Sequence, residues 1–81
     1  MKIEVLGPGC KNCSALEKAT NEALDQLGMD ASVDKVTDYA TIAGYGVMST
    51  PALVVDGEVR TVGRVPSAGE IAELLADAGG R

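Results

Sequence analysis

The spacing of apolar residues changes along the chain, and each change marks an expected element. A short apolar run at residues 3–6 predicts a strand, which a Gly-Pro-Gly turn at residues 7–9 ends. Apolar residues then recur at helical spacing, which predicts a helix from about Lys11 to Leu27 with Gly28 at its C-terminal cap. The expected buried stripe of that helix consists of Leu16, Ala19, Ala23, Leu24 and Leu27.

The middle of the chain is more polar and predicts two short elements. The residues from Ala31 to Val36 favour a polar strand at an edge of the sheet. Thr37 or Asp38 can then cap a short helix, which runs through Ala43 and ends near the glycines at 44–46.

The last third of the chain predicts a hairpin and a helix. Two apolar runs, residues 51–55 and 58–62, flank an Asp-Gly pair, which is a strong hairpin signal. Ser67 and Glu70 have the spacing of a capping box at a helix start, and the glycines at 79–80 end that helix. Its expected buried stripe consists of Ile71, Leu74, Leu75 and Ala78.

The resulting order of elements is βαβαββα, and it predicts an α/β fold in a single domain over residues 1–81. The β-α-β start implies a parallel pair of strands joined by a right-handed crossover. The closing hairpin adds two antiparallel strands. One mixed four-stranded sheet with helices on both faces accounts for every element.

Composition narrows the class of protein. The chain has 81 residues, no Phe or Trp and two Tyr, so the core of the domain must be aliphatic. The net charge is −5 and the seven basic residues are scattered, whereas binding to a phosphate backbone requires clustered Lys and Arg. We therefore expect no nucleic-acid partner and attribute the acidity to solubility.

The start of the chain and its cysteines indicate a compartment. Its apolar stretch is too short for a signal peptide, and no apolar run approaches the roughly 20 residues of a membrane helix. We therefore expect a cytoplasmic protein without membrane contact. Stable structural disulfides are rare in the cytosol, so the two cysteines favour a catalytic or metal-binding role.

The cysteine pair Cys10 and Cys13 lies at the junction of the first strand and the first helix. The N–H groups of a first helical turn favour a thiolate at Cys10 and lower its pKa below the free value of about 8.5, and Lys11 adds a nearby positive charge. Residues three apart are neighbours on a helix, so Cys13 can resolve a mixed disulfide formed at Cys10. Gly7 and Gly9 keep the approach loop small, which leaves Cys10 open to a protein partner.

The residues alone leave alternatives open for this pair. Structural zinc usually takes four Cys or His ligands, and the chain has two Cys and no His. A dimer could supply a second pair, a copper or arsenic site could use two sulfurs, or the pair could be inert. Redox chemistry is favoured, with a metal- or metalloid-binding carrier module as the alternative.

A second informative segment is Gly-Val-Met-Ser-Thr-Pro at residues 46–51, directly before the expected hairpin. From its position alone, Pro51 is an ordinary trans proline at a strand entry. Together with a CxxC at a helix start and a short second helix, however, this segment resembles the thioredoxin fold. The resemblance covers nearly the whole chain and is closest to small, glutaredoxin-sized thioredoxin-like proteins, also described as redox-active disulfide proteins. It implies a thiol–disulfide oxidoreductase that reduces protein disulfides with no bound cofactor or metal.

The resemblance also implies roles for individual residues. Pro51 would be a cis-proline beside the active cysteines, and Thr50 would pair its backbone with the substrate chain. Gly63 resembles the glycine that keeps this surface flat. Glu4 stands where thioredoxins carry a buried acid that helps to deprotonate the second cysteine, although we prefer to interpret it as a solvated strand charge.

Departures from the family motifs bear on the electron donor. Lys-Asn lies between the cysteines, where thioredoxins have Gly-Pro and glutaredoxins usually have Pro-Tyr. The acidic glutathione clamp of glutaredoxins is missing after Gly63, although Arg64 and Lys11 could each bind a glutathione carboxylate. We therefore expect a thioredoxin-reductase-like flavoprotein as the donor.

Structural roles are expected for three further residues. Met48 is expected to fill a gap as an apolar contact, and Tyr39 and Tyr45 to lie in the core or at the rim of the second helix. The chain could also be a protein-interaction domain on a redundant thioredoxin scaffold, but its intact CxxC argues against that hypothesis.

Overall fold

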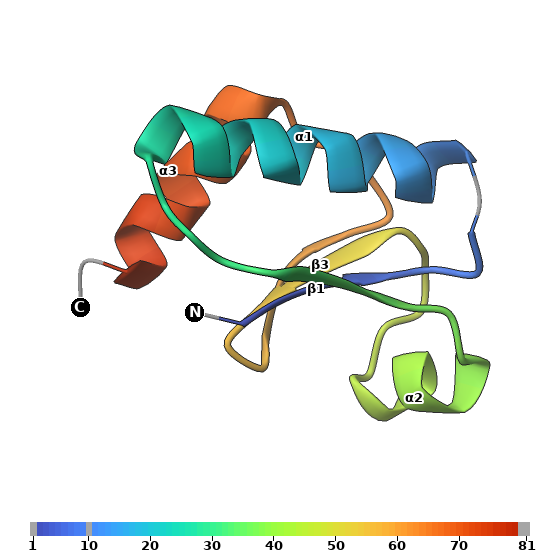
Figure 1. Ribbon diagram of the computed structural model, residues 1–81. Helices are drawn as coiled ribbons and strands as arrows, with labels where there is room; N and C mark the ends of the chain where they lie inside the picture. The colour runs from blue at the N-terminus through green and yellow to red at the C-terminus, as the bar shows by residue number, and fades with distance from the viewer. Residues whose placement is uncertain (1, 10, 80–81) are drawn as a thin grey trace.

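The computed structural model of the chain describes residues 2–9 and 11–79 (Figure 1). Within these residues the order of elements is βαβαββα, as the sequence predicts. The elements are β1 (Ile3–Leu6), α1 (Lys11–Leu27), β2 (Val33–Val36), α2 (Tyr39–Gly44), β3 (Ala52–Val55), β4 (Glu58–Val62) and α3 (Ala68–Gly79). Three parts of the predictions lie outside the described residues and side chains: Cys10, the Ala78 side chain and Gly80.

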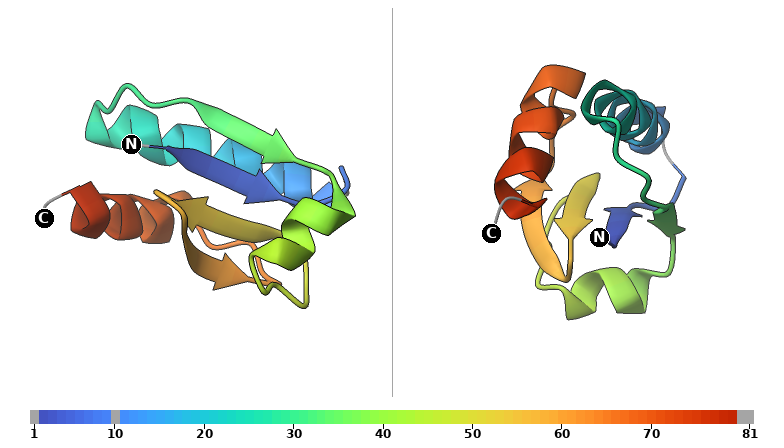
Figure 2. Two further views of the ribbon diagram at one scale, coloured as in Figure 1. Left: turned by 90° about the horizontal axis from the view of Figure 1, so that it is seen from below. Right: turned by 60° about the vertical axis from the view of Figure 1, so that its left-hand side comes forward.

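The strands in the described part of the chain form one mixed four-stranded sheet with the order β2-β1-β3-β4 (Figure 2). β1 runs parallel to β2 and antiparallel to β3, and β3 and β4 form the predicted hairpin. Both turn residues of this hairpin, Asp56 and Gly57, have positive φ angles, of 51° and 82°, as a tight hairpin turn requires. The predicted α/β class and sheet are thus confirmed.

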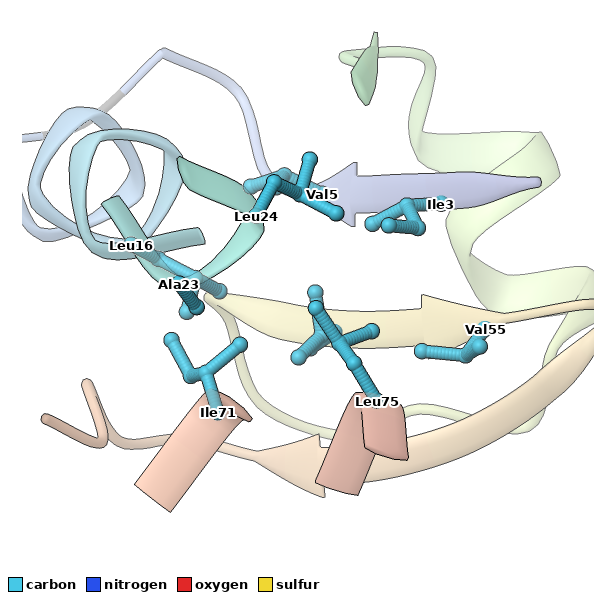
Figure 3. Packing of buried hydrophobic residues seen from close by; sticks show 9 residues of the cluster. Ile3, Val5, Leu16, Ala23, Leu24, Val55, Ile71 and Leu75 are labelled. Carbon is cyan, nitrogen blue, oxygen red and sulfur yellow. The ribbon is translucent and has the colours of Figure 1, made fainter. Parts of the chain in front are cut away.

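Helices cover both faces of the sheet, as expected. α1 and α3 lie side by side over one face, and α2 lies under the other (Figures 1 and 2). The face under α1 and α3 carries the larger apolar cluster, in which side chains from both helices meet those of the two central strands (Figure 3). Its buried members are Ile3, Val5, Leu16, Ala23, Leu24, Leu53, Val55, Ile71 and Leu75.

The opposite face carries a smaller apolar cluster beneath α2. Its buried members are Leu6, Ile42, Ala52 and Val54, with Val36, Tyr45, Val47 and Val59 packed against them. Ile42 is buried in this cluster and joins α2 to the sheet. A helix of 6 residues is too short to be stable by itself, so α2 depends on this packing and on its cap.

Asp38, and not Thr37, caps α2. Its side chain accepts hydrogen bonds from the Thr41 backbone N–H at 3.0 Å and from the Thr41 hydroxyl at 2.7 Å. These two donors hold the pKa of the Asp38 carboxyl below its ordinary value. The cap fixes where the chain turns from β2 into α2.

The structure corrects two details of the predicted elements. β2 begins at Val33 rather than at residue 31, because Val33 pairs with Ile3, the first residue of the short strand β1. Leu27, expected in the buried stripe of α1, is exposed at the last turn. Thr20 is buried on α1 instead. Its hydroxyl donates a hydrogen bond to the Leu16 carbonyl at 2.7 Å, so the buried hydroxyl has a partner.

The described residues contain three helices, α1, α2 and α3. None of them has both the length and the apolar character that a membrane span needs.

Candidate active site

Several predicted site residues meet at one end of the molecule. The C-terminal end of β1, the start of α1 and the segment between α2 and β3 lie at the right-hand end of Figure 1. A Cβ atom placed on Gly7 would lie 2.1 Å from the Cys13 Sγ and 3.8 Å from the Thr50 Cβ. The Gly63 N–H donates to the Pro51 carbonyl at 2.8 Å. These contacts bring residues from four segments of the chain into one site.

Cys13 occupies the first turn of α1 and is 6% exposed. Its sulfur is disulfide-bonded. The buried sulfur of Cys13 suits the resolving role predicted for it, because a buried thiol is shielded from attack by other molecules. Cys10 lies outside the described residues, so its role as nucleophile stays a prediction.

Gly7 lies against the side chain of Cys13. It is buried, and its N–H donates to the Val36 carbonyl of β2 at 2.8 Å, which continues the pairing of β1 by one residue. Gly7 therefore makes room for the Cys13 sulfur, and its part in keeping the loop around Cys10 open stays a prediction, because Cys10 lies outside the described residues. The sequence shows a glycine directly after the first strand. It does not show that Cys13 lies beside this glycine, because that contact depends on how α1 packs on the sheet.

The Thr50–Pro51 peptide bond is cis, in agreement with the resemblance. Thr50 is exposed and Pro51 is buried, so the surface at this point is formed by Thr50. The φ angle of Gly63 is +73°, and a Cβ there would lie 3.2 Å from the Ser49 Cβ. Both the backbone conformation and the close neighbour therefore favour glycine at position 63.

Glu4 is buried, and our interpretation of it as a solvated strand charge is wrong. The residue is 7% exposed at the centre of the sheet, where it pairs with Asp34 of β2 and Val54 of β3. The Tyr45 hydroxyl, from the C-cap of α2, donates to Glu4 Oε1 at 2.8 Å. This hydrogen bond, with burial and the nearby carboxylate charge, raises the pKa of Tyr45 above its ordinary value.

The contact between Glu4 and Tyr45 also places the carboxylate relative to the sheet. Side chains alternate between the faces of a strand, and Leu6 belongs to the cluster under α2. Glu4 shares that face with Leu6, whereas Cys13 lies on α1, above the other face. A proton-accepting role of Glu4 toward Cys13 stays a prediction.

Other candidate residues lie on the surface. Lys11 is exposed, so solvent screens its charge. Arg64 forms an ion pair with Glu70 of α3, and this partner raises the pKa of Arg64. Met48 is 96% exposed, which makes the expectation of a gap-filling contact wrong. Tyr39 is 70% exposed, whereas Tyr45 packs against the smaller cluster as expected.

In the described part of the chain, no group of three or more His, Cys, Asp or Glu could hold a metal ion. A two-sulfur copper or arsenic site at the cysteine pair was an alternative to redox chemistry, and no finding here supports it.

Comparison with known proteins identifies the family. The family model described as a thioredoxin domain matches residues 1–76. A thioredoxin from Methanothermobacter thermautotrophicus is 43% identical over 76 residues, which are 94% of this chain and 99% of that protein. A thioredoxin from Methanocaldococcus jannaschii is 37% identical over 73 residues, which are 90% of this chain and 84% of that protein. The chain therefore belongs to the thioredoxin family and is a thiol–disulfide oxidoreductase.

Proposed function

We propose that residues 1–81 act as one thioredoxin-like domain that reduces disulfides of other proteins in the cytoplasm, with Cys10 as nucleophile and Cys13 as resolving thiol. One observation carries the proposal. The Cys13 sulfur is disulfide-bonded and buried in the first turn of α1, close to Gly7 and Thr50. A redox-active sulfur at this point lies beside the segment that would receive a substrate chain.

The proposed reaction has two exchange steps. The Cys10 thiolate attacks one sulfur of the substrate disulfide; that bond breaks, a mixed disulfide forms, and the released substrate thiolate takes a proton. The Cys13 thiolate then attacks the Cys10 sulfur and displaces the second substrate thiolate. The substrate gains two electrons and two protons, and the chain is left with a Cys10–Cys13 disulfide. The N–H groups at the start of α1 would stabilise the attacking thiolate.

The substrate chain would lie along the surface formed by Thr50, Pro51 and Gly63. Thr50 is exposed, while Pro51 is fixed below it by the hydrogen bond from the Gly63 N–H to the Pro51 carbonyl, 2.8 Å long. A glycine at position 63 presents no side chain beside Ser49. A flat surface of this kind admits an extended peptide to the sulfur atoms.

The two-thiol mechanism predicts opposite behaviour for the two cysteine variants. Cys13→Ser should lose at least about 99% of insulin-reduction activity yet trap substrates as mixed disulfides through Cys10, because no second thiol releases them. Cys10→Ser should lose the activity and trap nothing. The measurement is insulin reduction, followed by non-reducing electrophoresis of captured proteins. Ser14→Ala, an exposed neighbour on α1, is the control and should keep wild-type activity. Wild-type turnover by Cys13→Ser would contradict the mechanism.

We also propose that a thioredoxin-reductase-like flavoprotein regenerates the dithiol. Of the two basic residues that could grip glutathione, Arg64 is already paired with Glu70. A thioredoxin reductase should therefore reduce the oxidised protein at least about ten times faster than glutathione with glutathione reductase does. The rate of NADPH consumption in each coupled assay measures this difference. Arg64→Ala, which removes the possible glutathione contact, should leave both rates unchanged. Faster reduction by the glutathione system would overturn this assignment of the donor.

A further inference from the structure

We propose that Gly7 is a positioning residue that sets the redox balance of the cysteine pair, by leaving space for the Cys13 sulfur in its disulfide form. The inference rests on the proposed function, because it concerns the same pair. Its basis is that a Cβ added to Gly7, directly after β1, would fall on the Cys13 Sγ in the first turn of α1.

The space beside Gly7 is filled by the cysteine. A Cβ on residue 7 would lie 2.1 Å from the Cys13 Sγ and 3.3 Å from the Cys13 Cβ. Two non-bonded heavy atoms do not approach to 2.1 Å, so one of the two must move if a side chain is added at position 7. The φ angle of Gly7 is not positive, so the position excludes larger residues by space and not by backbone conformation.

The backbone is held in place both at Gly7 and at Cys13. The Gly7 N–H donates to the Val36 carbonyl at 2.8 Å, which ties this residue to the edge of the sheet. Cys13 and Leu16 are three residues apart on α1 and both are buried, and Leu16 belongs to the cluster between α1 and the sheet. A methyl group at position 7 would therefore act mainly on the Cys13 sulfur.

The sulfur responds differently in the two redox states. In the disulfide, a covalent bond fixes the Cys13 Sγ, and it cannot leave the space beside Gly7 without moving its partner. In the dithiol, the side chain can rotate about χ1 to another staggered rotamer. An added methyl group thus destabilises the disulfide more than the dithiol, and glycine at position 7 favours the disulfide.

The relevant equilibrium is the exchange with glutathione. The protein disulfide and two glutathione molecules give the protein dithiol and one glutathione disulfide, with two electrons and two protons passing to the protein. Gly7→Ala should shift this equilibrium toward the protein dithiol by about tenfold or more, which corresponds to a reduction potential about 30 mV more positive.

The test is a titration of the protein in glutathione redox buffers, with alkylation and mass spectrometry to count the thiols. Gly44→Ala is the matched control, because no atom lies within 4 Å of a Cβ at that position and its φ is not positive. The control should stay within about twofold of the wild type. Equal constants for Gly7→Ala and Gly44→Ala would overturn the role of Gly7 and leave the proposed function intact. A wild type without a two-electron exchange would overturn both.

A second pair of variants tests the proposal even if Gly7→Ala alone fails to fold. In a Cys13→Ala background the sulfur that the new methyl group would meet at 2.1 Å is gone, and the residue 13 Cβ at 3.3 Å remains. In that background, Gly7→Ala should lower the midpoint of urea unfolding by less than half as much as it does in the oxidised wild-type background. If Gly7→Ala alone does not fold, the double variant with Cys13→Ala should fold. An undiminished effect in the Cys13→Ala background would overturn the proposal, because the methyl group would then act on something other than the sulfur.

Discussion

The two faces of the sheet are built differently. The face under α1 and α3 is closed by two long helices over the larger aliphatic cluster, and the polar side chains buried there are the uncharged Thr20 and Thr61. The face under α2 is closed by a helix of 6 residues, and its buried side chains include the carboxylate of Glu4. Where one face relies on aliphatic packing, the other combines packing with the hydrogen bond from the Tyr45 hydroxyl to Glu4, 2.8 Å long.

The difference suggests how stability and function are divided. Tyr45 is the C-cap of α2, and the chain runs from it through residues 46–50 to Pro51. The face under α2 therefore holds the segment that we assign to substrate binding. Segments that bind partners often belong to the less stable parts of a fold. The hydrogen bond at Tyr45 fixes one end of this segment to the central strand.

The largest expected effect compares a leucine from each face. Leu53 and Leu6 are both fully buried, the first under α1 and α3 and the second under α2. Leu53→Ala should lower the free energy of unfolding by about 4–5 kcal/mol and Leu6→Ala by about 2–3 kcal/mol, because a thinly covered face closes more easily over a cavity. A domain of this length is stable by about 4–12 kcal/mol in total, so the first loss is severe.

Urea unfolding of the two alanine variants measures this difference. The slopes of the transitions should match that of the wild type, so that the midpoints report stability alone. A loss for Leu6→Ala equal to or greater than that for Leu53→Ala would contradict the division of the fold into a strong and a weak face.

The fold was largely predictable because local patterns determine it. The bounds of α1 match the prediction from the apolar spacing and Gly28, and the Asp-Gly pair located the hairpin. Glu4 was misinterpreted because its partner is 41 residues away in the sequence. The alternation of side chains along a strand does not indicate which polar residue accepts a hydrogen bond from a donor that is distant in the sequence. The exposure of Met48 likewise depends on how the segment before Pro51 lies on the sheet.

The site was predictable to the extent that its residues belong to motifs. The cysteine pair and the segment ending at Pro51 are contiguous patterns in the sequence, and the structure brings Cys13 and Thr50 to the same end of the fold. The contact of Gly7 with Cys13 is different, because it depends on the distance between β1 and α1. From the sequence alone, a glycine before a CxxC motif could either leave the first cysteine accessible to a partner or make space for the sulfur of the second. No sequence pattern distinguishes these two roles.

An intermediate effect is expected from the polar contact of the face under α2. Tyr45→Phe removes the donor and leaves Glu4 buried without it, which should lower Tm by about 4–8 °C. Adding Glu4→Leu to Tyr45→Phe replaces both partners by apolar groups and should recover at least half of that loss. Thermal unfolding of the single and double variants tests this. A double variant less stable than Tyr45→Phe alone would show that Glu4 stabilises the fold through something other than Tyr45.

The hydrogen bond between Tyr45 and Glu4 should also make the stability of the protein depend on pH. The folded state raises the pKa of Tyr45 above its ordinary value of 10.0, so the stability from this group is fully present below pH 10 and is lost as the pH rises through the raised pKa. The difference in Tm between the wild type and Tyr45→Phe should therefore be constant from pH 7 to 9 and shrink above pH 10. A difference that grows in alkali would contradict the assigned hydrogen bond.

The smallest expected effect concerns the helix caps on the two faces. Asp38 caps α2 with a carboxylate that accepts from the Thr41 N–H at 3.0 Å, whereas the hydroxyl of Ser67 at the start of α3 accepts from the Glu70 N–H at 3.2 Å. The folded state lowers the pKa of Asp38 from 3.8, so its stabilising effect is present above that value and is lost as the pH falls through the lowered pKa. Asp38→Asn keeps a capping acceptor that does not titrate, and it should lower Tm by about 2–4 °C at pH 7. That difference should shrink as the pH falls below 3.8, while the loss caused by Ser67→Ala stays constant, because a hydroxyl does not ionise in this range. Thermal unfolding across the acid range measures both, and a constant difference for Asp38→Asn would show that the charge of Asp38 contributes nothing to the cap of α2.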